Sequence, residues 1–407
     1  MPSPRSASPR RLLYVANEDY AFLMHRLPMA RAARDAGYEV HVATNVNAGA
    51  AAIRAEGFVL HPIPFQRGGL SPSSALPTIR AIRAVEAAIS PDVVHHSGLQ
   101  SSVLGSLAAL GRATPVVNAM TGLGYIFTSA SWRSRLLKQG MLWLMPWLMN
   151  RAPSRVLVQN PDDREALKAM GVRGDKITLI PGSGVDTDRF RPLPEPSGPI
   201  TFGFAGRLLT DKGIRALVAA HRMLRQQGRD DQLLIAGSPD PANPASVSPE
   251  EIEAWRHEPG ITLLGHVKDI AELWRRSHIA VLPSHREGLP VSLLEAAACG
   301  RPLISTDAPG CREIAIDGQT GLSVPIEDAA ALAQAMTQLA TSPDLRARYG
   351  QAARQLVEDK LSATIIGRSV VALYDGLATA SGPHRCSQTP PPSRLPSHCL
   401  RPQWARC

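Results

Sequence analysis

Residues 200–237 have the sequence ITFGFAGRLLTDKGIRALVAAHRMLRQQGRDDQLLIAG. An apolar run, 200–206, comes before a segment, 212–224, whose apolar residues recur at helical spacing, and a second apolar run, 231–237, follows. This order of strand, helix and strand is typical of parallel sheets that are covered by helices on both faces. In such sheets the loops at the carboxyl ends of the strands hold the ligand.

The same alternation continues in both directions along the chain. Ala-rich amphipathic segments that end at Gly37 and Gly57 separate the first apolar runs. Residues 17–26, NEDYAFLMHR, are expected to form a loop that leads into the first helix. Further strands are expected at residues 10–16, 39–45, 59–65, 91–97, 114–120, 155–160, 261–267, 279–284 and 302–307.

A proline-rich segment divides the two halves. Residues 192–199, PLPEPSGP, contain four prolines, which a helix or a central strand does not tolerate. We therefore predict an α/β fold in which two doubly wound Rossmann-like domains face a cleft. The predicted parts are an N-terminal domain (11–190), a linker (191–199), a C-terminal domain (200–362), a final helix (363–380) and a disordered tail (381–407).

Composition and charge narrow the possible functions. The chain has 407 residues, enough for two domains, and its net charge of +9 favours anionic partners. A basic protein that binds nucleotides or nucleic acid without catalysis stays open as an alternative, but no zinc finger, helix-turn-helix or RNP string supports nucleic acid as a partner. None of the five cysteines forms a CxxC pair, so we expect free thiols, a cytoplasmic location and no metal site.

A first candidate site lies in the string GRLLTDKG, residues 206–213. Gly206 permits close approach of the backbone where a strand turns into a helix, and the start of the next helix attracts anions. Arg207 and Lys212 add two positive charges, and arginine is suited to bidentate phosphate contacts. This combination predicts a diphosphate site.

A second candidate site lies in SHREGLPVSLLEAAACG, residues 284–300, where seven residues separate Glu287 from Glu295. Glu295 falls in the mainly apolar stretch LLEAAAC of an expected helix. A carboxylate in such surroundings is costly unless it is paired or binds hydroxyl groups of a ligand. We therefore interpret Glu295 as functional rather than as part of a solvated helix face.

Three strings together resemble the retaining family-4 glycosyltransferases. EGLPVSLLE (287–295) is similar to their E-x7-E motif, GRLLTDKG to their phosphate-binding segment, and PGSGVDTDRFRP (181–192) to their interdomain segment. The strings occur in the family's order, and the resemblance covers nearly all of residues 11–378. It implies the GT-B fold, with an acceptor-binding N-terminal domain and a C-terminal domain that binds the nucleotide sugar.

The resemblance also implies roles for individual residues. Arg207 and Lys212 would neutralise the donor diphosphate in place of a metal ion. Glu287 would contact the transferred sugar, and Glu295 would hold the ribose hydroxyls. The donor would be a UDP-sugar, and no cofactor would be needed.

The family's remaining donor contacts are backbone contacts. Gly288 and Leu289 would offer backbone N–H groups to the sugar or phosphate. The backbone of residues 265–267, up to Val267, would meet the base.

Candidate acceptor residues lie in two loops of the first half. His25 and Arg26 could meet a phosphate or hydroxyl group, although a lone histidine is as often structural. Gly122 and Gly124, in the loop TGLGY, could let a phosphate approach the backbone. Many relatives carry a histidine near this loop, where this chain has Met120-Thr121. In this respect the chain resembles the bacterial N-acetylgalactosaminyltransferases that act on undecaprenyl-diphosphate-linked sugars.

Residues 132–151, WRSRLLKQGMLWLMPWLMNR, combine tryptophan, leucine and methionine with cationic ends, which is typical of an interfacial amphipathic segment. We expect a peripheral contact with the inner face of the cytoplasmic membrane, where a polyprenyl-diphosphate saccharide would be the acceptor. A nucleotide-sugar 2-epimerase is an alternative that the E-x7-E string disfavours. A nicotinamide dehydrogenase is disfavoured because no GxGxxG follows the first strand.

Overall fold

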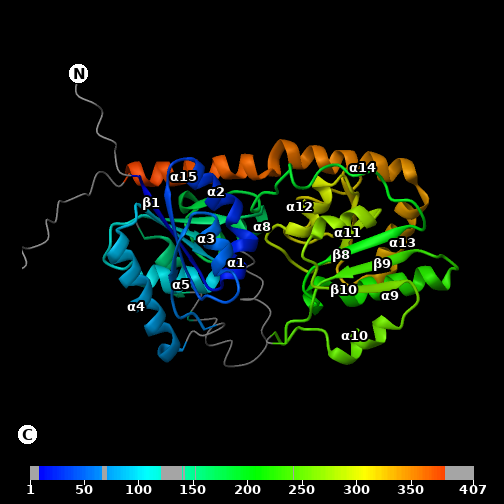
Figure 1. Cartoon of the computed structure of the whole chain (residues 1–407), viewed down its shortest axis with the longest axis horizontal. Coiled ribbons are helices and arrows are strands. Elements are labelled where there is room, and N and C mark those ends of the chain that lie inside the picture. The colour runs from blue at the N-terminus through cyan, green and yellow to red at the C-terminus, as the bar shows by residue number, and fades with distance from the viewer. Residues whose placement is uncertain are drawn as a thin grey trace, which may run out of the picture.

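The computed structural model describes residues 9–66, 71–120, 140, 143–151, 153–241 and 243–380. These residues form two lobes, each built on a parallel sheet, as Figure 1 shows. The tail that we predict at 381–407 lies outside the described residues.

The N-terminal sheet has the strand order β3-β2-β1-β4-β5-β6-β7, with parallel pairing throughout. Its strands are β1 (Arg11–Ala16), β2 (Glu39–Thr44), β3 (Val59–Pro62), β4 (Val93–Ser97), β5 (Val116–Ala119), β6 (Ser154–Val158) and β7 (Ile177–Leu179). Its helices are α1 (Asp19–His25), α2 (Leu27–Asp35), α3 (Ala50–Ala55), α4 (Pro72–Ile89), α5 (Leu99–Ala108) and α8 (Pro161–Ala169).

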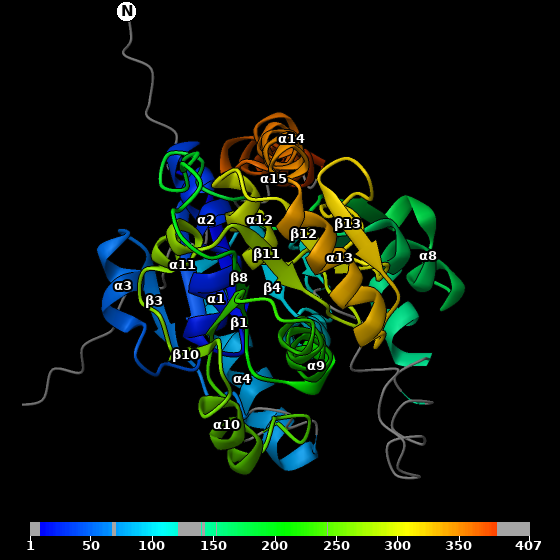
Figure 2. The same ribbon diagram turned by 90° about the vertical axis from the view of Figure 1, so that its right-hand side faces the viewer.

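The C-terminal sheet has the order β10-β9-β8-β11-β12-β13, again parallel. Its strands are β8 (Thr201–Ala205), β9 (Gln232–Ala236), β10 (Ile261–Gly265), β11 (Ile279–Leu282), β12 (Leu303–Thr306) and β13 (Gly321–Val324). Its helices are α9 (Ile214–Gln226), α10 (Pro249–Arg256), α11 (Ile270–Arg276), α12 (Val291–Ala298), α13 (Ala329–Thr341) and α14 (Pro343–Leu356). Figure 2 shows α12 and α9 on opposite sides of this sheet.

Both sheets have a topological switch point. The strand order reverses between β1 and β4 in one sheet and between β8 and β11 in the other. Ligands of open parallel sheets bind outside the carboxyl ends of the strands at this point. Nearly all residues of the central strands β1, β4, β8 and β11 are buried, as expected for sheets that are covered on both faces.

The chain returns to the N-terminal lobe at its end. A π-helical turn, Val357–Leu361, joins α14 to α15 (Ala363–Ala380), and the two helices run along one side of both lobes in Figures 1 and 2. Val185 and Ser362 form a parallel bridge next to this turn. The side chains of α15 enter the same core cluster as β1 and α2.

Three elements differ from the sequence expectation. Residues 19–25, expected in a loop, form helix α1, because the buried Asp19 carboxylate accepts hydrogen bonds from the backbone of Asn47 and Gly49 and so fixes the helix on the sheet. Helix α10 and the edge strand β13 were not anticipated. Helix α10 begins with a capping box between Ser248 and Glu251, a signal that the sequence does contain.

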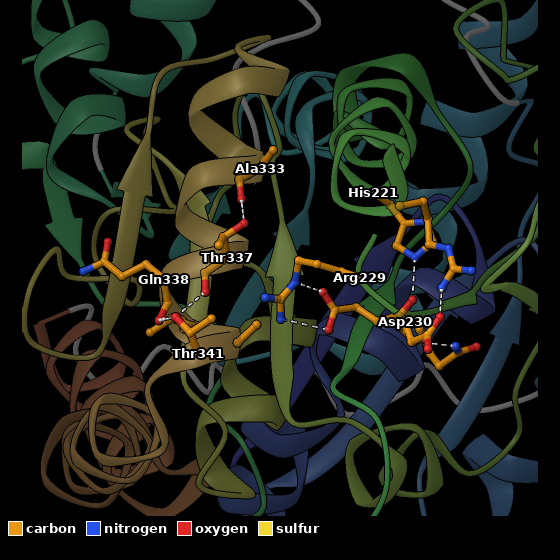
Figure 3. A network of polar contacts seen from close by, with 12 residues as sticks. His221, Arg229, Asp230, Ala333, Thr337, Gln338 and Thr341 are labelled. Carbon is orange, nitrogen blue, oxygen red and sulfur yellow. Dashed lines mark hydrogen bonds and ion pairs between the residues drawn. The ribbon is translucent and has the colours of Figure 1, made fainter. Parts of the chain in front are cut away.

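The Asp230-Asp231 pair has one exposed and one buried member. Asp230 is exposed and pairs with Arg225, but Asp231 is buried. The Asp231 carboxylate accepts two hydrogen bonds from Arg229. The backbone carbonyl oxygen of Asp231 lies 2.9 Å from Nε2 of His221, as part of the network in Figure 3. Because this network precedes β9, it lies at the amino ends of the strands and away from the switch point.

The part of the chain that the structure describes contains neither a candidate metal cluster nor a candidate membrane-spanning helix. It contains no cluster of three or more His, Cys, Asp or Glu side chains that could hold a metal ion. None of its helices combines the length and apolar character that crossing a membrane requires.

Candidate active site

The cationic loop follows β8, the strand at the switch point of the C-terminal sheet. Gly206 and Arg207 come directly after this strand, and Lys212 lies in a short 3-10 turn, Thr210–Lys212. Gly213 then has φ +68°, and a Cβ there would lie 1.9 Å from the carbonyl oxygen of Pro283. Only glycine therefore lets the start of α9 approach the end of β11, and this approach brings Lys212 to the loop that carries Glu287.

Lys212 and Glu287 form an ion pair at this edge of the sheet. Nζ of Lys212 donates to Oε1 of Glu287, and Oγ of Ser284 donates to the same oxygen at 2.7 Å. The two charged side chains are only 20% and 13% exposed. The two residues were expected to contact different parts of the donor, and the structure joins them directly, so a donor diphosphate would meet a lysine that a carboxylate already orients.

Arg207 stands apart from this pair. Its guanidinium lies 3.0 Å from the carboxylate of Asp240, and its side chain is 52% exposed. Much of its hydrogen-bonding surface is therefore open for a phosphate group.

Glu295 lies on helix α12, which follows the loop that carries Glu287. Burial raises the pKa of its carboxyl to about 8, although the charge of Arg189 acts in the opposite direction. Within the described part of the chain, this carboxyl forms no hydrogen bond and no ion pair. A partly buried acid without a protein partner is suited to accept hydrogen bonds from ligand hydroxyl groups.

Helix α1 of the N-terminal lobe faces this site. His25 is an exposed residue, yet desolvation by the surrounding protein, together with the charges of Arg26, Lys212 and Arg207, lowers the pKa of its ring to about 4. His25 is therefore neutral at pH 7 and lies within electrostatic reach of both Arg207 and Lys212. Tyr20, which sequence reasoning did not single out, is 54% exposed on the same helix. Burial raises the pKa of its phenol, and the charges of Arg207 and Glu295 also act on it.

The other candidate acceptor residue that the structure describes, Arg26, is not exposed at this site. Arg26 is wholly buried, and its Nε donates to Oγ of Ser97 at 3.0 Å. Direct contact with an acceptor would require this side chain to move, so its role stays a prediction. Gly122 and Gly124 lie outside the described residues.

Leu289 and Gly288 join the two lobes. The Leu289 side chain is 6% exposed and packs against Gly182, where a Cβ would lie 2.6 Å from the leucine Cδ2. The carbonyl oxygen of Gly288 accepts a hydrogen bond from Asn160 of the N-terminal lobe. The Leu289 side chain is thus used in packing, and only its backbone could serve the donor.

A pocket of about 310 Å³ lies beside the same strand ends. Leu208, Gly237 and Gly265 line it, together with Ile252 and Arg256 of α10. It includes the first residue of the 265–267 segment that we expect to meet a base. Val267 itself is half-buried and packs against the core of this lobe.

Comparisons with known proteins agree with this geometry. A family profile described as "Glycosyl transferases group 1" matches residues 185–356, and one described as "Glycosyl transferase 4-like domain" matches residues 25–182. The chain is 26% identical over 382 residues to the N,N'-diacetylbacillosaminyl-diphospho-undecaprenol alpha-1,3-N-acetylgalactosaminyltransferase of Campylobacter jejuni. That match covers 90% of this chain and 98% of the relative.

Solved structures show the same fold. Sucrose-phosphate synthase from Thermosynechococcus elongatus has a TM-score of 0.77 at 21% identity, covering 91% of this chain and 100% of that one. Anabaena HepE in complex with UDP has a TM-score of 0.74 at 17% identity, covering 90% and 100%. The two Rossmann-like domains thus form the GT-B fold, and the two family profiles make the chain a glycosyltransferase. The chain belongs to the family of group 1 and 4-like glycosyltransferases, which confirms the fold and the enzyme class that the sequence predicts.

Proposed function

We propose that this enzyme transfers a hexose or N-acetylhexosamine from a UDP-sugar to a polyprenyl-diphosphate-linked saccharide in the assembly of a surface polysaccharide or glycan, with retention of configuration and without a metal ion. The observation that carries the proposal is the Lys212–Glu287 pair at the carboxyl ends of the strands, with the half-exposed Arg207 on the same edge of the sheet. The 26% identical Campylobacter relative, whose name includes a diphospho-undecaprenol acceptor, supports the lipid-linked acceptor. The UDP complex of a structural neighbour supports the donor.

The charges at the site suit the chemistry of glycosyl transfer. Breaking the bond between the anomeric carbon and the β-phosphate oxygen leaves negative charge on the diphosphate and oxocarbenium character on the sugar. Arg207 and Lys212 would stabilise the leaving diphosphate, and this stabilisation grows as the bond breaks. The acceptor oxygen would form its bond on the same face, and its proton would pass to the departing phosphate. Glu287 would orient the sugar, and Glu295 the ribose.

The domains would divide the substrates. The C-terminal domain, 200–362, would bind the donor, with the backbone of Gly288 and Leu289 near the diphosphate and residues 265–267 near the base. The N-terminal domain, 11–190, would bind the acceptor through α1, where His25 faces the donor cations.

The proposal is tested by measuring UDP release from a panel of UDP-sugars, in EDTA, with polyprenyl-diphosphate saccharides as acceptors. We expect release that requires acceptor, survives EDTA and is lost in Glu295→Ala, and product NMR should show retention. An epimerised donor without any need for acceptor would favour the 2-epimerase instead. Release that stops in EDTA would contradict metal independence, and silence across the panel would contradict the UDP-sugar donor.

Residues 143–151 support a peripheral membrane contact. Residues 143–149 are helical, with Met145, Leu148 and Met149 buried against the lobe. Trp143 and Trp147, one turn apart, are 79% and 50% exposed. Exposed tryptophans favour the boundary between lipid headgroups and acyl chains.

We expect the double substitution Trp143→Ala/Trp147→Ala to weaken binding to phosphatidylglycerol–phosphatidylethanolamine vesicles by about tenfold or more, because two large apolar side chains no longer leave water. Co-sedimentation measures the partition. Ile326→Ala, which removes an exposed apolar side chain from the C-terminal lobe, is the control and should leave binding unchanged. Equal binding of the wild type and the double variant would contradict the contact.

A further inference from the structure

One amide of the N-terminal lobe reaches the backbone of the donor-site loop. Asn160 follows β6 and caps α8, where its Oδ1 accepts from the backbone N–H of Asp163 at 2.7 Å. Its Nδ2 donates to the carbonyl oxygens of Gly288 at 2.8 Å and Glu287 at 3.2 Å. The Asn160 side chain is fully buried, and both its oxygen and its nitrogen are hydrogen-bonded within the protein.

A buried ion pair reinforces this contact. Asp163, also fully buried, binds Arg286 through one carboxylate oxygen and accepts from Nδ2 of Asn160 through the other at 3.0 Å. Burial raises the pKa of Asp163, and the hydrogen bond and charge of Arg286 act against that increase. Residues 286–288 are thus held at three successive positions by two side chains of the other lobe.

The remaining bonds of Glu287 come from its own lobe. Its N–H donates to the carbonyl oxygen of Pro309 at 2.8 Å, and its carboxylate binds Ser284 and Lys212. Gly310 has φ +81°, and a Cβ there would lie 2.4 Å from the Glu287 carbonyl oxygen. This carbonyl therefore lies in a tight space, and a shift of the loop would carry the carboxylate with it.

We propose that Asn160 is a positioning residue, which sets the orientation of Glu287 from the acceptor-binding lobe and makes the donor site complete only when the two lobes are joined. This inference rests on the proposed function, because it assumes that Glu287 contacts the transferred sugar. The Asn160 side chain itself touches no substrate. Loss of its donor group would leave the fold and the contacts with the base and the ribose intact, while the sugar is held less well for reaction.

Asn160→Ser is the informative variant, because a serine oxygen still caps α8 but does not reach across as an amide donor. Asn160→Asp also keeps the cap and places a carboxylate beside two carbonyl oxygens and Asp163. Asn150→Ser is the matched control, since Asn150 makes the same kind of backbone bonds, with Gly171 and Arg173, inside one lobe.

We expect kcat of Asn160→Ser to fall about tenfold to hundredfold, as for a misplacement of about 1 Å. The Kd for UDP should rise by a smaller factor than the one by which kcat falls, because the contacts with the base and the ribose stay in place, and hydrogen exchange of residues 286–289 should speed up. Asn160→Asp should lower kcat further than Asn160→Ser does. Asn150→Ser should change neither kcat, nor the Kd for UDP, nor the exchange of residues 286–289. Wild-type kcat and exchange in Asn160→Ser would overturn the inference, as would a fall in kcat matched by an equal loss of UDP affinity.

The exchange and UDP-binding measurements need no sugar donor or acceptor. If the wild-type enzyme transfers no sugar from any UDP-sugar, the proposed function fails, while faster exchange in Asn160→Ser would still show the contact between the lobes. Unchanged exchange in an active enzyme would instead refute the positioning role alone.

Discussion

Replacing Arg207 with alanine should lower kcat/KM for sugar transfer by about 10²–10³, or about 2.7–4 kcal/mol, by comparison with the loss of one preorganised donor to a developing oxyanion. The guanidinium is half exposed at the carboxyl end of β8, so a diphosphate can reach it without rearrangement of the core. Lys212 would remain, but Glu287 already neutralises part of its charge. Steady-state kinetics over a range of donor concentrations measures the effect.

Arg222→Ala is the matched control for this substitution. Arg222 is 51% exposed and, like Arg207, pairs with one carboxylate, that of Glu258. Both substitutions should change the thermal midpoint little, because exposed ion pairs contribute only about 0–1 kcal/mol. Equal kcat/KM in the two variants would refute the phosphate-binding role of Arg207.

Replacing Glu295 with glutamine should weaken UDP binding while stabilising the fold at high pH. Burial raises the pKa of this carboxyl to about 8 from 4.5, so the unfolded chain releases the proton at lower pH than the folded one. The wild type therefore loses stability as pH rises from 4.5 to about 8, and the loss is complete above that range. Glutamine has no such proton, so its thermal midpoint should exceed that of the wild type at pH 8.5 and match it near pH 4.

Above pH 8, where the carboxyl is ionised, the UDP affinity of Glu295→Gln should be about tenfold to hundredfold lower than that of the wild type, the size expected when charged hydrogen bonds to ribose hydroxyls are lost. Calorimetry with UDP and thermal melts at several pH values measure both effects. Glu86→Gln is the control, because burial also raises the pKa of Glu86, to about 7, in the other lobe. It should show a stability gain of the same sign with unchanged UDP affinity. Unchanged affinity in Glu295→Gln would contradict the ribose contact.

The fold was largely predictable because most strands and helices have their own local sequence pattern. The apolar runs coincide with strands, and the glycines at 37 and 57 follow helices as expected. Helix α1 was not predictable, because its N-cap residue Glu18 makes no side-chain cap and the helix depends on the tertiary contacts of Asp19. Local signals carry no information on such contacts.

The residues of the site could be predicted from short sequence motifs, but the contacts between these residues could not. Parallel strands bring Arg207, Lys212 and Glu287 to one edge, which the alternation implies. The ion pair between Lys212 and Glu287 joins residues 75 positions apart, and Asn160 lies 127 positions from Glu287. Neither pairing follows from spacing. Tyr20 could have been found only by knowing that its helix faces the other lobe.

The final helix has a consequence for the order in which the protein can fold during synthesis. Ile366, Val370 and Tyr374 of α15 are buried in the core beside β1, and Tyr374 Oη lies 2.9 Å from Tyr14 Oη. The ribosome adds these residues only after both sheets have been translated. The N-terminal lobe is therefore incomplete when it emerges, and part of its core stays open to water until the second lobe has been synthesised. A nascent chain halted before residue 363 should expose that apolar surface to chaperones and proteases, even though every strand of its sheet is already present.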